Sequence, residues 1–341
     1  MTTRTTITHA TEAAWLADRK LDITSTEVAA LFGAGAYIKT PYELYHLKAG
    51  LLAPEAFEGN ERTKWGNRLE APIAHGIAED LGLIVEPFKV YMRIEECRLG
   101  ASFDFKIIGL VEDADENEAR AMFRQHGTGI LEIKNVDGLQ FKRAWIDDGE
   151  VIEAPAHIEM QVQAQMEVAD IGWSIIAPLV GGNTPRPIIR VRDLVIGEAI
   201  RTKAAELWQR VATKTAPAPD FTKDGDVIAD IYRDNDGSTV DLSHVPLVGA
   251  LCRAYKKASA EEKNAKDAKN AAKAELLTII KAAKVAIVPG YKVSAGTNKA
   301  SFRAYYREGF EKMTVTLTQV SGVQIEAEVP AFRNVRIGEA A

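Results

Sequence analysis

The sequence predicts a mixed α/β fold followed by a separate C-terminal region. Up to about residue 212, segments with apolar residues at helical spacing alternate with segments of strand-like alternation. The stretch TKTAPAPDFTKDGD then interrupts this pattern, and its content of Pro, Ala and Asp is typical of a linker. A long helical segment with a weak, alanine-rich repeat follows. We therefore expect a domain over 1–214, a linker over 215–244 and an extension over 245–341.

Composition restricts the function classes. With 46% hydrophobic and 26% charged residues, the chain is typical of a soluble globular protein, and no run of 18 apolar residues could span a membrane. The N-terminus MTTRTTITHATEAAW lacks the apolar core of a signal peptide, so we expect a cytoplasmic protein. Cys97 and Cys252 provide neither a disulfide framework nor a zinc or iron–sulfur pattern, and the chain has no Gly-rich phosphate loop.

The net charge of −6 conceals an uneven distribution along the chain. Residues 251–307 contain thirteen Lys or Arg and only four Asp or Glu, so the remainder is strongly acidic. A basic segment favours a polyanionic partner, and an acidic body offers ligands for a metal ion.

The first third of the chain is expected to be helical. Residues 11–34 read as a helix, a short turn and a second helix that stops at Gly33. TPYELYHLKAG predicts another helix, with Pro41 in its first turn. TKWGNRLEAPIAHGIAEDLG predicts a longer helix, because its apolar residues recur every four positions.

The middle of the chain is expected to supply the strands. LIVEPFKVYMR and LGASFDFKIIG read as two antiparallel strands, and the polar residues 112–128 that follow read as a loop or a mobile insertion. The remaining expected elements are a strand at ILEIKNV, a helix at APAHIEMQVQAQMEVAD, strands at IGWSIIAPLVGG and PIIRVRDL, and a helix over 194–212.

The C-terminal region predicts a long helix over about 245–284 and a small β-unit, with VPGYKV as a turn. Its basic residues Lys292, Lys299, Arg303 and Arg307 are interleaved with Phe302, Tyr305 and Tyr306. Cations can neutralise phosphates and aromatic rings can stack on bases, so DNA binding is one interpretation. A small β-unit with a solvated basic face is the other.

The strand GILEIKNVDG carries charge where burial is expected. Side chains alternate along a strand, so Ile130, Glu132 and Lys134 share one face. An edge strand with a surface ion pair would explain this pattern. A metal site would explain it too, because a carboxylate binds a hard cation and a lysine can neutralise a reacting oxygen.

Asp104 is the second unusual acidic residue, because it stands between Phe103 and Phe105. A buried carboxylate needs a partner. If its strand neighbours the strand of Glu132 and Lys134, the three side chains converge, and two carboxylates with waters and phosphate oxygens suit Mg²⁺. The alternative is that Asp104 caps a turn at the end of its strand.

Two further polar residues flank these strands in sequence. Glu70 lies on the helix before them, and Gln161 lies beside the apolar stripe of the helix after them. The order helix-Glu, strand-Asp, strand-Glu-x-Lys, helix-Gln is far more restrictive than any one of these residues.

In this order, the motifs WLADRKLDITSTEV, KWGNRLE, GASFDF, LEIK and MQVQ resemble the phage exonucleases of the lambda-exonuclease type, also called YqaJ-like viral recombinases. These belong to the PD-(D/E)xK nuclease superfamily, and the resemblance covers about 15–195. It implies a restriction-endonuclease-like core with a mixed central sheet flanked by helices. It also implies resection of linear double-stranded DNA from the 5′ end, a single-strand annealing partner, a homo-oligomer such as a trimer, and the cytoplasm of a bacterial host.

The resemblance also assigns roles to residues. Asp104, Glu132 and the carbonyl of Ile133 would bind Mg²⁺, or Mn²⁺ in its place, and Lys134 would position the attacking water or stabilise charge on the phosphate. Glu70 would serve a second metal, directly or through water, and Gln161 would help place substrate or water. The residues that would hold the 5′-phosphate are Arg19, Thr26 and Ser25.

Two departures from the family pattern keep alternatives open. Family members usually have Pro before the metal-binding aspartate and Gly after it, where this chain has Phe103 and Phe105. ITST replaces the more frequent ITAS, so the phosphate-binding hydroxyl is either Ser25 or Thr26. An endonuclease of the same fold and a catalytically silent DNA-binding recombination scaffold are the competing functions.

Overall fold

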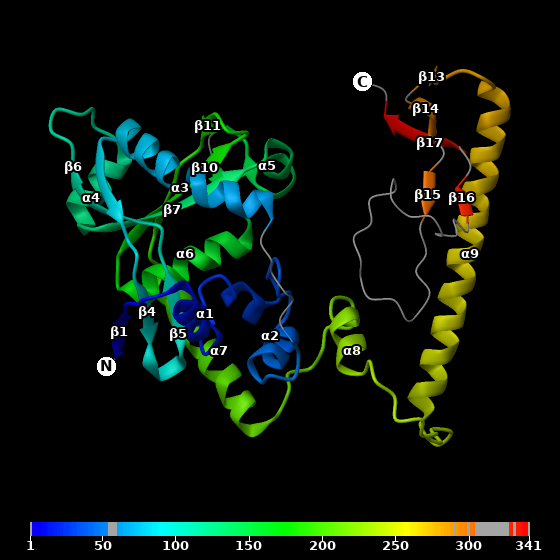
Figure 1. Cartoon of the computed structure of the whole chain (residues 1–341), viewed down its shortest axis with the longest axis horizontal. Helices are drawn as coiled ribbons and strands as arrows, with labels where there is room; N and C mark the ends of the chain where they lie inside the picture. Colours follow the sequence, from blue (N-terminus) through cyan, green and yellow to red (C-terminus); the bar gives the residue numbers. More distant parts are fainter. Residues whose placement is uncertain are drawn as a thin grey trace, which may run out of the picture. The chain divides into compact units, whose positions relative to one another are not determined.

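The computed structural model describes residues 2–53, 60–149, 151–289, 291–298, 301–303, 327–329 and 332–339. The chain divides into two compact units, Met1–Asp236 and Gly237–Ala341 (Figure 1). None of the helices in the described residues is both long enough and apolar enough to cross a membrane.

The first unit is a mixed α/β domain. Its described helices are α1 (Glu12–Lys20), the 3₁₀ helix η1 (Val28–Phe32), α2 (Pro41–Lys48), α3 (Glu61–Asp80), the 3₁₀ helix η2 (Glu95–Cys97), α4 (Glu118–His126), α5 (Gly138–Ala144), α6 (Ala156–Ala169), α7 (Leu194–Thr213) and α8 (Gly225–Ile231). Its described strands are β1 (Arg4–Ile7), β2 (Ile23–Thr24), β3 (Leu83–Pro87), β4 (Tyr91–Ile94), β5 (Leu99–Ser102), β6 (Phe105–Leu110), β7 (Gly129–Val136), β8 (Ile146–Asp147), β9 (Ile152–Glu153), β10 (Trp173–Val180), β11 (Thr184–Pro185) and β12 (Ile188–Val191).

Two sheets organise this unit. The six-stranded sheet has the order β11-β10-β7-β6-β3, with β12 also paired to β10, and the four-stranded sheet has the order β1-β4-β5-β2. The larger sheet is mixed, because β7 runs parallel to β10 and antiparallel to β6. The expected mixed sheet flanked by helices is therefore confirmed.

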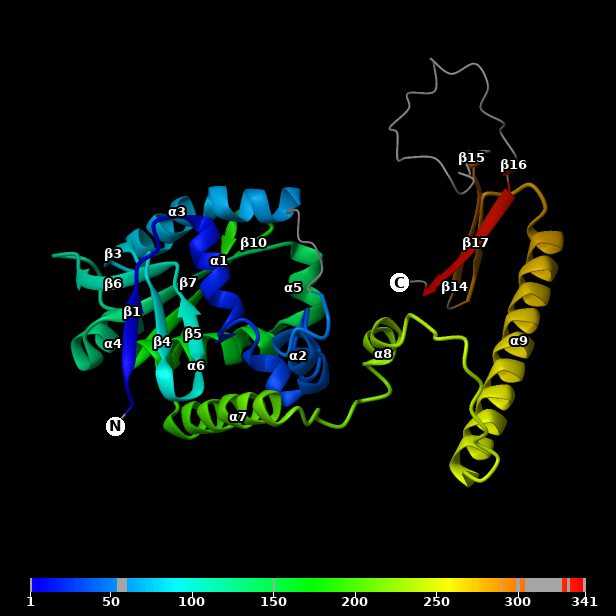
Figure 2. The same cartoon turned by 60° about the horizontal axis from the view of Figure 1, so that its bottom comes forward.

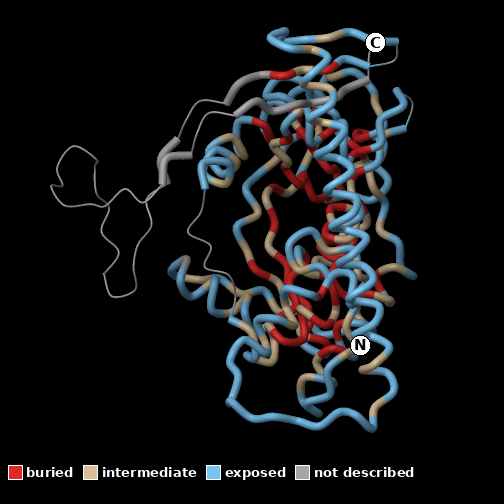
Figure 3. Tube along the Cα trace, turned by 90° about the vertical axis from the view of Figure 1, so that its right-hand side faces the viewer, coloured by how far each residue is buried: buried red, intermediate tan, exposed pale blue. Residues whose placement is uncertain are grey.

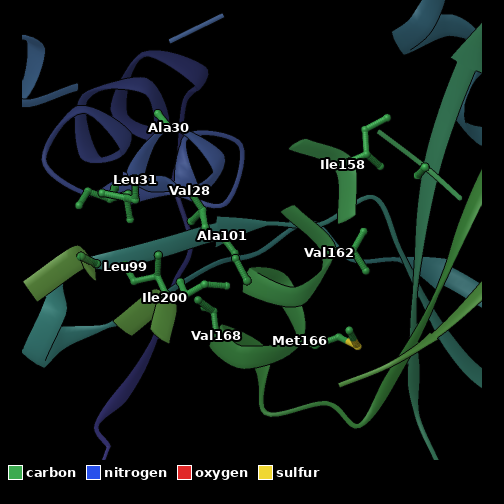
Figure 4. Packing of buried hydrophobic residues seen from close by; sticks show 14 of the residues in the cluster. Val28, Ala30, Leu31, Leu99, Ala101, Ile158, Val162, Met166, Val168 and Ile200 are labelled. Carbon is green, nitrogen blue, oxygen red and sulfur yellow. The ribbon is translucent and has the colours of Figure 1, made fainter. Parts of the chain in front are cut away.

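Hydrophobic cores lie on both faces of the six-stranded sheet. On one face α6 packs between that sheet and a layer made of the four-stranded sheet, η1 and α7, and on the other face α3 and α4 cover it. Figure 2 shows α3 and α7 along opposite sides of the domain. Figure 4 shows Val162 and Met166 of α6 in the first core, with Ala101 of β5 nearby. Burying these apolar surfaces on both faces is what holds β7 in the interior.

The two long strands expected in the middle of the chain are each broken in two. β3 pairs with β6 in the larger sheet, whereas β4 pairs with β5 in the smaller one. The breaks fall after Pro87 and at Phe103–Asp104, and the backbone N–H of Phe88 donates to the carbonyl of Asp104 (3.0 Å) where the two breaks meet. A single hairpin thus crosses from one sheet to the other at Asp104.

The expectation of a loop over 112–128 is wrong, because the structure has α4 there. Asn117 caps this helix by accepting from the N–H of Arg120 (3.2 Å). Arg120 is buried and donates to the carbonyls of Gly82 (2.7 Å) and Val111 (2.9 Å). These contacts dock the insertion against the sheet. The second N-terminal helix also differs from expectation, since η1 is a 3₁₀ helix that ends at Gly33 with φ +69°.

The C-terminal unit contains one long helix and short strands. Its described elements are α9 (Pro246–Ile280), β13 (Val285–Val288), β14 (Tyr291–Asn298), β15 (Ser301–Arg303), β16 (Ala327–Val329) and β17 (Phe332–Glu339). β14 pairs antiparallel with β13 and β17, and the last residue of β13, Val288, pairs with the first of β14, Tyr291. Gly290 of the expected VPGYKV turn lies outside the described residues, and its last three residues belong to β14. No residue of α9 is buried among the described residues (Figure 3).

Candidate active site

β7 brings Glu132 and Lys134 into the interior of the molecule. Ile130 packs into the core on one face of the sheet, whereas Leu131 and Ile133 pack into the core on the other. Glu132 and Lys134 therefore share the face of Ile130, as the alternation predicts. Because β7 lies between β6 and β10, the edge-strand interpretation is wrong.

Asp104 reaches this strand through the register of β6. Phe105 pairs with Leu131, and the antiparallel ladder ends there, so Asp104 comes opposite the Glu132–Ile133 segment. The backbone N–H of Ile133 donates to Asp104 Oδ2 (2.8 Å). The carboxylate thus contacts the neighbouring strand, and the alternative that it caps its own turn is not what the structure shows.

The two phenylalanines fix the crossing in place of the family's Pro and Gly. Phe103 stacks on Phe88 with ring centroids 4.5 Å apart and lies in one core. Phe105 lies in the other core, where its ring forms a T-shaped pair with the ring of His75. The backbone at Asp104 is therefore anchored on both sides by buried aromatic rings.

The Glu132 carboxylate is enclosed by donors, and its residue is only 3% exposed. Lys134 Nζ (2.7 Å) and Gln161 Nε2 (2.6 Å) both donate to Oε1. Gln165 Nε2 donates to Oε2 (2.7 Å). Lys134 Nζ also donates to Gln161 Oε1 (3.2 Å), so lysine and amide hold each other beside the carboxylate.

The electrostatics are those of two carboxylates in a poorly solvated space. Burial, and then the charge of Glu132, raise the pKa of Asp104 to about 8, although the Ile133 N–H and the Lys134 ammonium oppose the shift. Burial alone would lower the pKa of Lys134, but the charge and hydrogen bond of Glu132 outweigh it and the pKa is raised. Lys134 is thus a cation at neutral pH. For Asp104, the favourable contacts with the Ile133 N–H and Lys134 do not offset burial and the charge of Glu132, so its charged form is disfavoured.

Glu70 lies on α3 at the margin of this group. Its charge also raises the pKa of Asp104, but its Oε1 accepts from Lys89 Nζ (3.1 Å). Across the described residues, no three His, Cys, Asp or Glu side chains come close enough together to hold a metal ion. The pair Asp104 and Glu132 remains as the candidate metal site: both are carboxylates, which divalent cations prefer as ligands, and such an ion would relieve the repulsion that contributes to the raised pKa of Asp104.

Comparison with known proteins bears on the region that contains this group. Residues 14–172 match the sequence profile of the YqaJ-like viral recombinase domain. This segment is a YqaJ-like viral recombinase domain. It includes every candidate catalytic and 5′-phosphate-binding residue, and it excludes the C-terminal basic residues. Among curated proteins, no match was found.

Solved structures similar to this chain include exonucleases. The alkaline exonuclease LHK-Exo from Laribacter hongkongensis is 20% identical, with a TM-score of 0.44 over 60% of this chain and 94% of that chain. LHK-Exo in complex with dAMP gives 18% identity and a TM-score of 0.42, over 60% and 94%. A phage-related exonuclease from Haemophilus somnus 129PT gives 14% identity and a TM-score of 0.33, over 62% and 92%.

The expected phosphate-binding residues of the YqaJ-like domain lie around β2. The Arg19 guanidinium lies over the Trp15 ring, 4.5 Å from its centroid, and burial lowers the pKa of Arg19 while Glu27 and Tyr91 oppose that shift. Ser25 is buried, whereas Thr26 is exposed. Thr26 Oγ1 lies 3.0 Å from Thr24 Oγ1. Of the two candidate hydroxyls, only that of Thr26 belongs to an exposed residue.

The C-terminal basic residues are described only in part. Lys292 is exposed on β14, and Arg303 ends β15, but Lys299 and Arg307 lie outside the described residues, as do Tyr305 and Tyr306. Their role in DNA binding stays a prediction.

Sequence reasoning missed Gln165. It lies four residues after Gln161, which is about one turn further along the same face of α6. That spacing was the signal that could have found it, since the motif MQVQAQ contains both residues.

Proposed function

We propose that the chain is a Mg²⁺-dependent deoxyribonuclease that resects linear double-stranded DNA as an exonuclease, from 5′ to 3′. The YqaJ-like domain over residues 14–172 supports this proposal, because the family resemblance implies resection of DNA ends. The observation that carries it is the meeting of Asp104, Glu132 and Lys134 where β6 and β7 adjoin. Metal-binding carboxylates beside a fixed cation suit phosphodiester hydrolysis, because both stabilise negative charge on the reacting phosphate.

Asp104 and Glu132 would hold the Mg²⁺, for which Mn²⁺ would substitute. The carbonyl of Ile133 would be a further ligand, because the N–H and C=O of a strand residue face the same neighbour and its N–H faces Asp104. A bound divalent ion would lower the pKa of a water and stabilise charge on the phosphate. Lys134 orients the attacking water or stabilises the developing phosphate charge, since its ammonium is held beside Glu132.

Two more residues assist at this site. Gln161 places water or substrate, because its amide lies against both Lys134 and Glu132. Glu70 acts as the outer carboxylate, serving a second metal directly or through water. The ion pair with Lys89 occupies Glu70 Oε1, so direct coordination would use Oε2 or require the pair to open.

The chain recognises DNA ends through Arg19 and Thr26, and Ser25 is the alternative source of the phosphate-binding hydroxyl, although it is buried. A guanidinium held over an indole ring offers a fixed fork for a phosphate. The exposed hydroxyl of Thr26 supplies a further donor. This arrangement supports exonuclease action over internal cleavage, because a terminal phosphate exists only at an end.

The wider assignments rest partly on composition and partly on the family. Composition gives an exonuclease domain over 1–214, a linker over 215–244 and an extension over 245–341, whose long helix would hold DNA, form an oligomer contact or dock the annealing protein. The family resemblance supplies the partner and the assembly. The partner is a single-strand DNA annealing protein, and the assembly is a homo-oligomer, such as a trimer. Recombination of phage DNA would take place in the cytoplasm of a bacterial host.

The test compares DNA substrates and variants. Linear duplex with 5′-phosphate or 5′-hydroxyl ends and circular duplex are incubated with Mg²⁺ or with EDTA. We expect digestion of the linear DNA with Mg²⁺, fastest with 5′-phosphate ends, and none with Glu132→Ala or Lys134→Ala. Glu159→Ala is the matched control, because Glu159 lies on α6 but pairs with Arg190 (2.7 Å). Cleavage of circular DNA would indicate an endonuclease, and no cleavage with Mg²⁺ or Mn²⁺ would indicate a silent scaffold.

A further inference from the structure

Gln165 occupies an unusual position behind the acidic pair. It lies on α6 and is 1% exposed. Its single amide nitrogen donates both to Glu132 Oε2 (2.7 Å) and to the backbone carbonyl of Ser102 (3.0 Å). An amide NH₂ has two hydrogens, so both are committed.

These two acceptors belong to the two segments that carry the acidic residues. Glu132 is on β7, and Ser102 is the last residue of β5, two residues before Asp104. The side-chain nitrogen of Gln165 therefore links β7, which carries Glu132, to the end of β5, which leads into Asp104. The crossing at Phe103–Asp104 belongs to neither sheet ladder, so this tie adds a direct link that backbone pairing does not provide.

The orientation of the Gln165 amide is determined by its partners. A flipped amide would put its oxygen against Glu132 Oε2 and the Ser102 carbonyl, and all three are acceptors. In the observed orientation, Gln165 Oε1 is buried with no hydrogen-bond partner among the described residues. The residue thus leaves one polar atom unsatisfied while it makes both bonds to the acidic segments, at a cost in stability.

Gln161 and Gln163 are on the same helix and make different contacts. Gln161 contacts Lys134 and the other oxygen of Glu132. Gln163 is also buried, but it donates to the carbonyl of Val191 (3.0 Å) and accepts from the N–H of Asp193 (2.9 Å), away from the acidic pair. Gln163 is therefore a matched control, with the same side chain, the same helix and two hydrogen bonds of similar length.

We infer that Gln165 is a positioning residue that sets the separation of Asp104 and Glu132 and thereby their affinity for a divalent cation. This inference rests on the proposed function, because it assumes that Asp104 and Glu132 are the metal ligands. It concerns only how these two residues are positioned, so it can be tested with the metal ion in the absence of DNA. Residues that hydrogen-bond to metal ligands in this way typically affect metal affinity by about 10- to 100-fold.

The experiment measures Mn²⁺ binding to the full-length chain by electron paramagnetic resonance, without DNA. Gln165→Met keeps the length and apolar volume of the side chain but removes both hydrogen bonds. We expect its Kd for Mn²⁺ to rise by about 10-fold, while Gln163→Met stays within about twofold of wild type. In DNA cleavage, the Mg²⁺ concentration for half-maximal rate should rise in the same proportion, with a smaller loss of kcat at saturating Mg²⁺.

Gln165→Asn covers the case in which Gln165→Met does not fold. Its shorter amide cannot reach both acceptors, so the same increase in Kd is expected. Unchanged Mn²⁺ affinity in a folded Gln165 variant overturns the inference, even if its thermal stability falls, and leaves the nuclease proposal standing. A wild-type chain that binds Mn²⁺ tightly and loses affinity in Gln165→Met, yet cleaves no DNA, supports the inference and refutes the proposed function. A wild-type chain that binds no Mn²⁺ overturns both.

Discussion

Replacing Asp104 with asparagine should make the metal-free protein more stable at alkaline pH. The pKa of Asp104 is about 8 in the folded chain, against an ordinary value of 3.8. Between these values the folded state retains the proton and the unfolded state releases it, so raising the pH favours unfolding. Each pH unit in this window costs about 1.4 kcal/mol, or about 4 kcal/mol from pH 5 to pH 8. Because the side chain is not fully buried, screening by solvent reduces the expected value to roughly 2 kcal/mol.

Urea unfolding of wild type and Asp104→Asn in EDTA, at pH 5 and pH 8, measures this quantity. The free energy of unfolding of wild type should fall relative to the variant by about 2 kcal/mol across that range. Asparagine can still accept from the Ile133 N–H, so the variant keeps the hydrogen bond and loses only the charge. Adding Mg²⁺ should restore wild type at pH 8 and leave the variant unchanged. Equal pH dependence of both proteins would refute the electrostatic reasoning, whatever happens to activity.

Three further predictions concern other parts of the molecule. Glu167→Gln should lower the free energy of unfolding by about 3 kcal/mol in urea titrations, because the buried carboxylate pairs with Arg192 and Arg201; a loss below about 1 kcal/mol would contradict this. Arg19→Lys should reduce the preference for 5′-phosphate over 5′-hydroxyl ends through KM, since an ammonium lacks the planar fork, and an unchanged preference would place the phosphate elsewhere. Deleting 237–341 should leave Mg²⁺-dependent cleavage in place but make DNA binding less salt-dependent, by about one unit of log–log slope for each phosphate that this region neutralises. An equal slope would show that the C-terminal region does not hold DNA.

The local patterns of the sequence predicted the charged strand correctly. Alternation along GILEIKNV placed Glu132 and Lys134 on one face, and helical spacing placed Gln161 on the helix beside them. These are local properties of one element, and the geometry of a strand or helix fixes them. The meeting of Asp104 with this strand was expected only on the condition that the two strands were neighbours, and the ladder from Phe105 to Leu131 meets that condition.

Properties that depend on distant contacts were not predictable in the same way. A period of two residues looks the same whether or not a strand changes sheets, so LGASFDFKIIG read as one strand although it is two. The helix α4 was missed because its polar sequence buries only Ala119 and Arg120. What stabilises it is Arg120 bonding to carbonyls about 10 and 40 residues away in sequence, which no local pattern reveals.

Because the hairpin is shared by the two sheets, the position of Asp104 depends on the packing of both cores. Phe103 is seated in one core and Phe105 in the other, so a rearrangement of either would shift the carboxylate between them. Replacing the four-stranded sheet and η1 by those of a relative would therefore have to preserve the packing of Phe103 to leave the chemistry intact. In related sequences, substitutions of the residues that pack on Phe103 should accordingly be accompanied by substitutions of those that pack on Phe105.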